Sequence, residues 1–153
     1  MKKNINSKII ELAKYIVSKY KYEDISAIKL QKILFFIRYE EKINKIDSKI
    51  FNSNYNFEAW INGPVNAESY NFFRNYFYEI DDLEEYIPND KYINEFRKYD
   101  KYIQKYIYEN KWDLVDKTHK NLGWIEARKG LKEKEIPSIK RKINEEKITE
   151  WRE

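Results

Sequence analysis

The first forty residues repeat apolar positions with the period of an α-helix. Residues 7–20 place five apolar side chains on one helical face, namely Ile9, Leu12, Ala13, Ile16 and Tyr20. This rhythm stops in the charged stretch 21–24, and the hydroxyl of Ser26 can then cap a second helix. The second helix carries an apolar stripe of Leu30, Ile33, Leu34 and Ile37. Phe36 and Tyr39 widen that stripe, which predicts a helix buried on more than one side.

A strand-like alternation replaces the helical rhythm after Asn44. Residues 50–51 and 57–61 are short apolar and aromatic runs, and 52–56 between them have the composition of a turn. We predict a small antiparallel β-hairpin from these two runs. Phe57, Ala59 and Ile61 would lie on one face of it, and Glu58 and Trp60 on the other. Gly63-Pro64 is expected to end the second strand, because proline cannot donate a hydrogen bond to a ladder.

Helical periodicity returns after the predicted hairpin. Asn66 is a candidate N-cap of a third helix with the core face Tyr70, Phe73, Phe77 and Ile80. A fourth helix after Pro88 would bury Ile93, Phe96, Ile103, Tyr106 and Ile107. A short fifth helix over 112–120 is expected to stop at Gly123. Ser138 would cap a charged last helix over 138–152, with Ile139, Ile143 and Trp151 on its apolar face.

The predicted fold class is mainly α with a small antiparallel β-hairpin. We expect one compact domain of about six helices over residues 1–153, a length that suits a single core. Hydrophobic residues make up 42% of the chain and aromatic residues 17%, whereas disordered chains are poor in aromatic residues. The chain is therefore expected to fold.

The absence of cysteine and the length of the longest apolar run bear on where in the cell the protein is expected. The chain has no cysteine, so a disulfide framework, a thiolate nucleophile and a cysteine-based zinc site are excluded. The longest apolar run, 33–37, is far too short to cross a bilayer, and Glu11 and Lys14 interrupt any signal-peptide core. These features predict a cytoplasmic protein without membrane contact.

The charge balance gives little support for nucleic-acid binding. The net charge of +4 comes from 30 basic against 26 acidic residues, so the basic excess is small. Ile, Lys, Asn, Tyr and Phe are all abundant, and all have A/T-rich codons. An A/T-rich genome therefore explains the lysine content without a nucleic-acid partner, and such a partner is not favoured.

The residues with possible chemistry are few. Asp113, Asp116 and His119 are spaced by three, and two carboxylates with an imidazole are suitable metal ligands or acid–base groups. They sweep around a helix instead of sharing a face, however, and the chain has no second histidine. We therefore favour a structural role for His119 in a local hydrogen-bond network. The three glycines form no phosphate-binding loop, and no catalytic, metal or cofactor residue is predicted.

A ladder of tyrosines lies in the predicted fourth helix. It consists of Tyr99, Tyr102 and Tyr106. Tyrosine is favoured at protein interfaces, so the ladder is a possible contact surface. It is equally compatible with a position in the core on one side and at its rim on the other.

Several motifs resemble one known family. The segments Leu30-Gln31-Lys32-Ile33-Leu34-Phe35-Phe36, Phe57-Glu58-Ala59-Trp60 and Asn62-Gly63-Pro64-Val65, followed by Tyr70, together resemble the Panacea domain, also called the SocA-like antitoxin domain. Thr118-His119, Trp124 and Ala127-Arg128 are similar to the second signature of that family. The resemblance spans 26–139. The signature residues are Leu30, Lys32, Trp60, Gly63, Pro64, Tyr70, Thr118, His119 and Trp124.

The resemblance implies a function. Members of the Panacea family are helical domains with a small β element. They act as antitoxins that neutralise a cognate protein toxin by direct contact. Some deliver the toxin to a protease, and some are carried on phages or prophages. A nucleic-acid-binding accessory protein and a proteolytic adaptor are the alternatives, and a metal hydrolase centred on His119 is a further one.

We expect the signature residues to be structural. Trp60 would anchor the hairpin on the helical core, and Gly63-Pro64 would fix the turn into the next helix. His119 and Trp124 would lock the end of the fifth helix. On this interpretation the residues that contact the toxin cannot be identified from one sequence.

Overall fold

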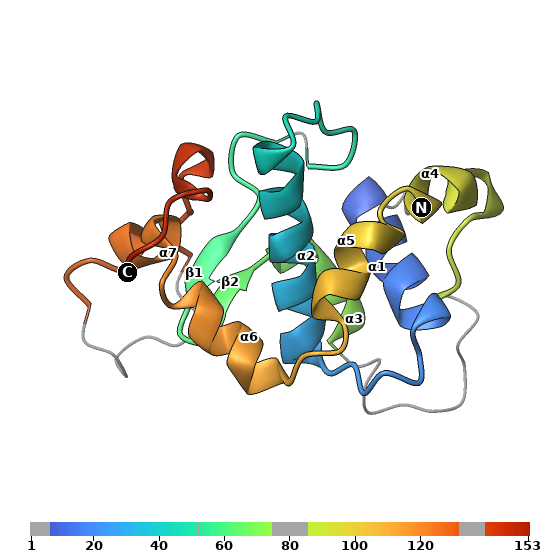
Figure 1. Ribbon diagram of the computed structural model, residues 1–153, viewed down its shortest axis with the longest axis horizontal. Coiled ribbons are helices and arrows are strands. Elements are labelled where there is room, and N and C mark those ends of the chain that lie inside the picture. The colour runs from blue at the N-terminus through green and yellow to red at the C-terminus, as the bar shows by residue number, and fades with distance from the viewer. Residues whose placement is uncertain (1–6, 52, 75–85, 132–139) are drawn as a thin grey trace, which may run out of the picture.

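A central helix, α2 (Ala27–Ile43), organises the fold (Figure 1). The computed structural model describes residues 7–51, 53–74, 86–131 and 140–153. Five elements pack against α2: α1 (Lys8–Lys19), α3 (Ala67–Phe73), α5 (Asp100–Tyr106), α6 (Lys111–Thr118) and the second strand of the hairpin. Two further α-helices are α4 (Ile93–Arg97) and α7 (Leu122–Ala127). Together they form a single mainly α domain with one hairpin, which confirms the predicted fold class.

Polar side chains set the start of most helices. Ser26 accepts a hydrogen bond from the Lys29 amide, and Asn66 accepts one from the Ser69 amide. The same arrangement is made by Ser7, Asn110 and Asn121. The predicted caps Ser26 and Asn66 are thus confirmed, and α1 and α2 begin where the local sequence indicates.

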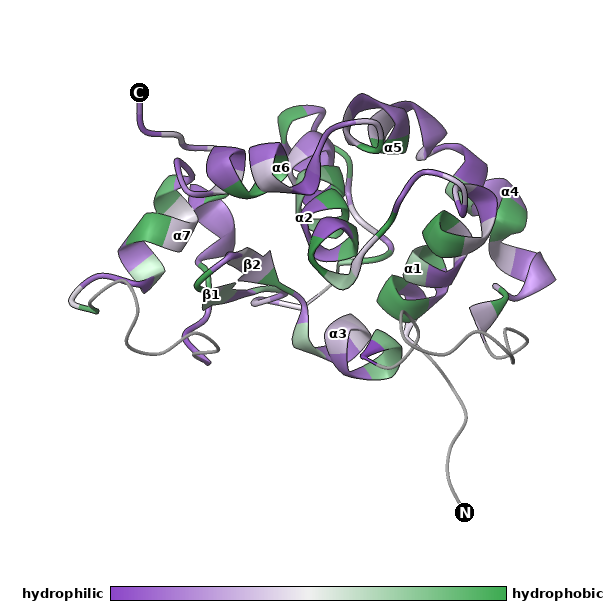
Figure 2. Ribbon diagram, turned by 90° about the horizontal axis from the view of Figure 1, so that it is seen from below, coloured by the Kyte–Doolittle hydropathy of each residue, from purple (hydrophilic) through white to green (hydrophobic). Residues whose placement is uncertain are grey.

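The core surrounds α2 on several sides. The predicted stripe of Leu30, Ile33, Leu34 and Ile37 is fully buried. Phe35 and Phe36 are buried as well, and Phe35 meets Phe57 of the hairpin edge to face. Figure 2 shows α2 at the centre of the molecule and α1 as largely hydrophobic beside it. The prediction of a helix buried on more than one side is confirmed.

The tyrosine ladder belongs to this core. Tyr99, Tyr102 and Tyr106 are all buried. The hydroxyl of Tyr99 donates to Glu41 Oε2 at 2.6 Å, and the hydroxyl of Tyr106 donates to Glu40. Burial raises the pKa of the Glu41 carboxyl and of both tyrosines. These bonds tie α5 to α2, so the ladder is not a free contact surface.

The hairpin lies further along the chain than predicted, because the predicted second strand is in fact the first. Its strands are β1 (Glu58–Trp60) and β2 (Gly63–Val65), and residues 50–51 are not a strand. Pro64 therefore lies within a strand instead of ending one. Pro64 stands opposite Ala59, whose amide donates outward to Arg141. The pair exchanges no hydrogen bond, so the amide proton that proline lacks is not needed there.

The C-terminal segment corrects a second prediction. The part of the predicted helix 138–152 that the structure describes, 140–153, holds only a 3₁₀ turn at Glu145–Lys147. Residues 141–143 instead lie antiparallel along the free edge of β1 (Ala59 amide to Arg141 oxygen 2.9 Å, Ile143 amide to Phe57 oxygen 2.9 Å). Edge backbone groups gain partners this way, which a helix would not supply.

Two helix boundaries also differ from the prediction. The fourth helix is divided at Lys98–Tyr99 into α4 and α5. Gly123 does not end the fifth helix but lies inside α7, while α6 has already stopped at Thr118. A Cβ on Gly123 would lie 2.9 Å from Ile143 Cγ2, so this glycine allows the C-terminal segment to pack closely. Phe77, Ile80, Ser138 and Ile139 lie outside the described residues.

No helix within the described ranges is both long enough and apolar enough to cross a lipid bilayer.

Candidate functional site

The signature residues meet around the β-hairpin. Trp60, Gly63 and Pro64 form the hairpin itself, and Leu30 lies in the core on α2. Side chains from α2, the end of α6 and α7 reach hairpin backbone carbonyls; these are Lys32, His119, Trp124 and Arg128. Residues distant in the sequence are therefore assembled at one place, which we treat as the candidate site.

Two donors from the α7 region hold the first strand. Arg128 Nη1 donates to the oxygen of Ala59 at 2.8 Å, and Trp124 Nε1 donates to the oxygen of Trp60 at 2.7 Å. Burial lowers the pKa of the Arg128 guanidinium. Backbone acceptors that would otherwise be buried without a partner are satisfied by these bonds.

His119 holds the hairpin turn. Its Nε2 lies 2.9 Å from the oxygen of Ile61, and a carbonyl oxygen only accepts, so Nε2 is the donor. The imidazole also stacks on Trp124, with ring centroids 4.3 Å apart and planes 15° apart. His119 and Trp124 thus both hydrogen-bond to the hairpin, whereas the sequence predicted that they would lock the end of the fifth helix.

Lys32 reaches the second strand from inside the core. The side chain is 1% exposed, and its Nζ donates to the oxygen of Pro64 at 2.9 Å. Burial lowers the pKa of the amine to about 7. Lys32 is thus the most deeply buried basic side chain among the described residues.

Gly63 allows these groups to approach each other. It has a φ of +111°, a conformation that favours glycine. A Cβ on it would lie 2.5 Å from Thr118 Oγ1 and 2.8 Å from Lys32 Cε. Thr118 is fixed by donating to the oxygen of Val115. The signature glycine is therefore required for both its backbone conformation and the space it leaves.

Trp60 is less buried than predicted. It is partly exposed, its ring packs on Tyr70 with centroids 4.8 Å apart, and its Nε1 donates to Glu58 Oε1. A pocket of about 270 Å³ opens between these two rings and α2, where Lys32 lines it. The expectation that Trp60 anchors the hairpin on the core is wrong for the side chain, because it is the Trp60 backbone that is held.

Sequence reasoning gave no role to Gln31, which the structure shows to be a connector. Its Oε1 accepts from the Asn66 amide at 2.7 Å, and its Nε2 donates to Ser69 Oγ at 3.0 Å. Gln31 thereby joins α2 to the start of α3. The signal was present in the Leu30-Gln31-Lys32 motif, but periodicity alone places Gln31 beside the apolar stripe without indicating a partner.

The candidate metal triad is not assembled. Asp113 and Asp116 are exposed on α6, whereas His119 is turned toward the hairpin. Within the described ranges, no group of three or more His, Cys, Asp or Glu side chains is placed to hold a metal ion.

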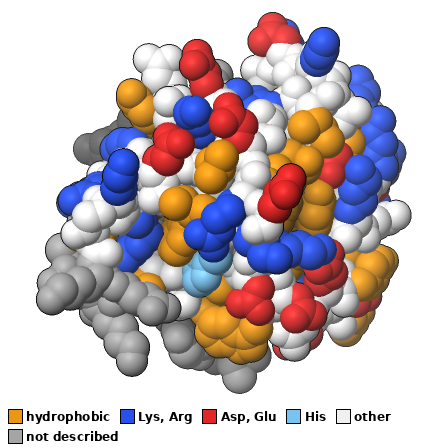
Figure 3. Space-filling view, turned by 60° about the vertical axis from the view of Figure 1, so that its left-hand side comes forward, with side chains coloured by type: hydrophobic (Ala, Val, Ile, Leu, Met, Phe, Trp, Pro, Cys, Tyr) orange, Lys and Arg blue, Asp and Glu red, His pale blue; other side chains and the backbone are white. Residues whose placement is uncertain are grey.

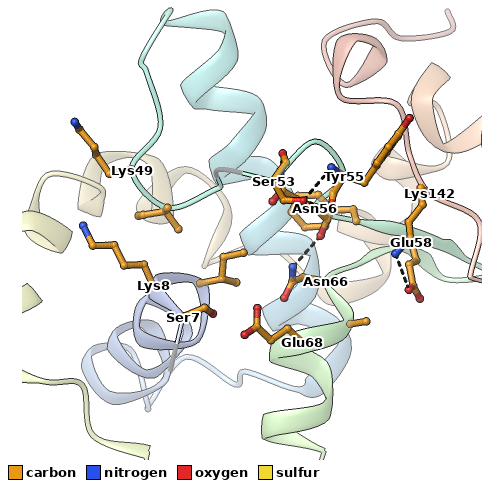
Figure 4. Close-up of a pocket in the computed structure, with 14 residues that line it drawn as sticks. Ser7, Lys8, Lys49, Ser53, Tyr55, Asn56, Glu58, Asn66, Glu68 and Lys142 are labelled. Atoms are coloured by element: carbon orange, nitrogen blue, oxygen red, sulfur yellow. Dashed lines mark hydrogen bonds and ion pairs between the residues drawn. The ribbon is translucent and has the colours of Figure 1, made fainter. Parts of the chain in front are cut away.

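A second and larger pocket lies next to the start of β1 (Figure 4). It has a volume of about 560 Å³ between the start of α1, the loop before β1 and the start of α3. Lys8 pairs with Glu95 and Lys142 pairs with Glu58, so these two cations are already neutralised within the chain. The pocket is polar and of mixed charge, and it contains none of the signature residues.

The outer face near the hairpin mixes apolar and charged groups. Figure 3 shows the only histidine of the chain, in pale blue, next to hydrophobic side chains and flanked by both basic and acidic ones.

Comparison of the chain with protein-family models, with curated proteins and with solved structures finds no match. The family resemblance therefore stays a prediction.

Proposed function

We propose that the chain is an antitoxin that neutralises a cognate protein toxin by binding it directly. One observation carries the proposal: residues of the family motifs that are far apart in the sequence contact the same hairpin. Lys32 and Arg128, for example, both donate hydrogen bonds to its backbone. Side chains that bond backbone carbonyls fix the shape of a domain and leave its outer surface available to a partner. The proposal thus treats the hydrogen bonds to the hairpin backbone as the scaffold, and the partly exposed Trp60 and Tyr70 rings with their surroundings as the interface.

The chemistry near the hairpin favours binding over catalysis. Lys32, His119 and Arg128 each bond a backbone carbonyl, so their donors stabilise the fold instead of presenting a nucleophile or a general base. Trp60 and Tyr70, by contrast, are partly exposed aromatic rings beside a pocket. Exposed aromatic side chains of this kind are the usual anchors of protein interfaces.

Co-expression tests the proposal. Antitoxins of the resembled family are paired with a toxin from a neighbouring gene, so the adjacent reading frame supplies the partner. We expect this chain to restore growth to cells that express the neighbour and to co-purify with it. Failure of a folded, well-expressed chain to do either would rule out that partner.

A folding control strengthens this test. Gly63→Val places a branched side chain where a Cβ alone would already contact Thr118 and Lys32, so this variant should lose both folding and rescue. Gly130→Ala meets nothing within 4 Å and should rescue like the parent chain. Rescue by the unfolded Gly63→Val variant would mean that growth recovers for a reason other than binding.

A further inference from the structure

The pocket beside Lys32 has the shape of a side-chain receptor. Trp60 and Tyr70 form one aromatic wall, and Ile28 and Val65 add apolar surface. Its volume of about 270 Å³ suits one side chain of a partner and not an extended ligand. Lys32 is the only charged residue among those that line it.

Lys32 lacks the carboxylate that another buried lysine of this chain has. Lys14 is also buried, and its Nζ lies 3.2 Å from Glu11 Oε2. Among the described residues, Lys32 has no ion pair, and the one hydrogen bond that its Nζ makes is to the neutral carbonyl of Pro64. A buried ammonium group is costly without a counter-charge, so an anion bound beside it would stabilise its charged form.

We infer that this pocket receives a carboxylate side chain of the partner protein, with Lys32 as its ion-pair anchor and the Trp60 and Tyr70 rings packed on its aliphatic stem. The partner is the toxin only if the proposed function holds, but the carboxylate selectivity of the pocket is independent of it. Glutamate fits this chemistry because two methylene groups separate its charge from its backbone.

Binding of this kind is coupled to protonation. The amine has a pKa of about 7 in the free chain, and an ion pair favours its charged form. Tyr70 is the only other titratable group among the residues that line the pocket, while Lys29 on α2, Glu68 on α3, His119 after α6 and Glu58 on β1 lie outside its lining. Glu58 is held by Trp60 Nε1 and Lys142, so it does not neutralise Lys32. A carboxylate ligand should therefore bind with uptake of a proton at and above pH 7.

A small-molecule titration followed by NMR tests the inference without the toxin. The probe is N-acetylglutamate α-amide, whose only charge is the side-chain carboxylate, and the matched control is N-acetylglutamine α-amide. We expect the acid to shift the Trp60 indole signal and to raise the pKa read from Lys32 Cε, and the amide to do neither. The acid should bind roughly 100-fold more weakly at pH 9 than at pH 6, because each pH unit above the amine pKa costs about tenfold.

The variant Lys32→Met completes the test. It should abolish the preference for acid over amide and the pH dependence, while a thermal melt verifies that it folds. If Lys32→Met does not fold, the Cε titration of the parent chain still decides the matter. Equal binding of acid and amide, or an unchanged Lys32 pKa at saturating acid, would overturn the inference.

The two proposals fail separately. Loss of growth rescue with intact acid binding would remove the antitoxin function and leave the pocket chemistry standing. Rescue that is unaffected by Lys32→Met, in a chain whose pocket shows no acid preference, would leave the antitoxin function and remove the pocket from it.

Discussion

At the scale of single residues, alanine substitutions at two glycines distinguish the cost of a steric clash from the cost of backbone strain. Gly63 and Gly130 both have positive φ, +111° and +90°, so an alanine is strained at either position. Only at Gly63 would the new Cβ also collide, with Thr118 and Lys32. We expect Gly130→Ala to lower the free energy of unfolding by about 1 kcal/mol and Gly63→Ala by about 2–4 kcal/mol. Urea unfolding measures both, and equal losses would mean that Thr118 and Lys32 move aside without cost.

The buried amine of Lys32 should make the free energy of unfolding depend on pH. Its pKa is about 7 in the folded chain and has the ordinary value of 10.5 when unfolded. As pH falls from 10.5 to 7, the unfolded chain gains a proton that the folded chain does not, so the free energy of unfolding falls by up to about 1.4 kcal/mol per pH unit. Below pH 7 both states are protonated and this contribution is constant.

Lys32→Met should remove that slope. Denaturant unfolding at pH 7, 8.5 and 10 is the measurement. We expect the parent chain to become more stable relative to Lys32→Met as pH rises, because only the parent chain carries the amine. Parallel stability profiles for the two chains would show that the amine titrates normally in the folded state.

At the scale of elements, the C-terminal segment offers a matched pair of isoleucines. Ile143 lies in the segment along β1 and is 0% exposed, whereas Ile87 is 57% exposed. We expect Ile143→Ala to cost about 2–5 kcal/mol because it leaves a core cavity, and Ile87→Ala to cost less than about 0.5 kcal/mol. Thermal and urea unfolding test this. Similar small losses for both would place the segment off the domain.

The elements that sequence reasoning predicted are those with local causes. Helices α1 and α2 begin at Ser7 and Ser26 because capping and periodicity act within a few residues. The pairing of Arg141 with Ala59 depends on a distant edge, which no local pattern indicates. Glu145 likewise bonds Arg38 of α2 instead of the helical neighbour that a charged C-terminal helix would provide.

The candidate site also has a part that local sequence could indicate and a part that depends on tertiary packing. Glycine next to proline drew attention to Gly63-Pro64 as a break in the strand, whereas the structure keeps both residues in β2 and gives Gly63 a positive φ. Neither spacing nor composition could show that Lys32 is buried without a carboxylate, because this depends on three elements packing together. The resemblance motifs marked the residues, and only the fold gave them contacts.

At the scale of the whole molecule, Trp60 distinguishes the scaffold from the contact surface. Trp60→Ala leaves the Trp60 carbonyl in place, so the bond from Trp124 Nε1 survives. The partly exposed ring packs mainly on Tyr70, and its loss should cost about 1–2 kcal/mol, less than the 3–5 kcal/mol of a fully buried tryptophan. If the proposed function and the pocket contact both hold, toxin binding and growth rescue should nevertheless fail, since the pocket loses a wall.

Trp112→Ala is the matched control for this variant. Trp112 is 49% exposed at the start of α6 and does not line the pocket. It should therefore melt like the parent chain and rescue growth. Calorimetry of both variants, alongside toxin pull-down, separates stability from binding. A loss above 3 kcal/mol in Trp60→Ala, with rescue recovering at lower temperature, would instead place the Trp60 side chain in the scaffold, and the partner contact would lie elsewhere.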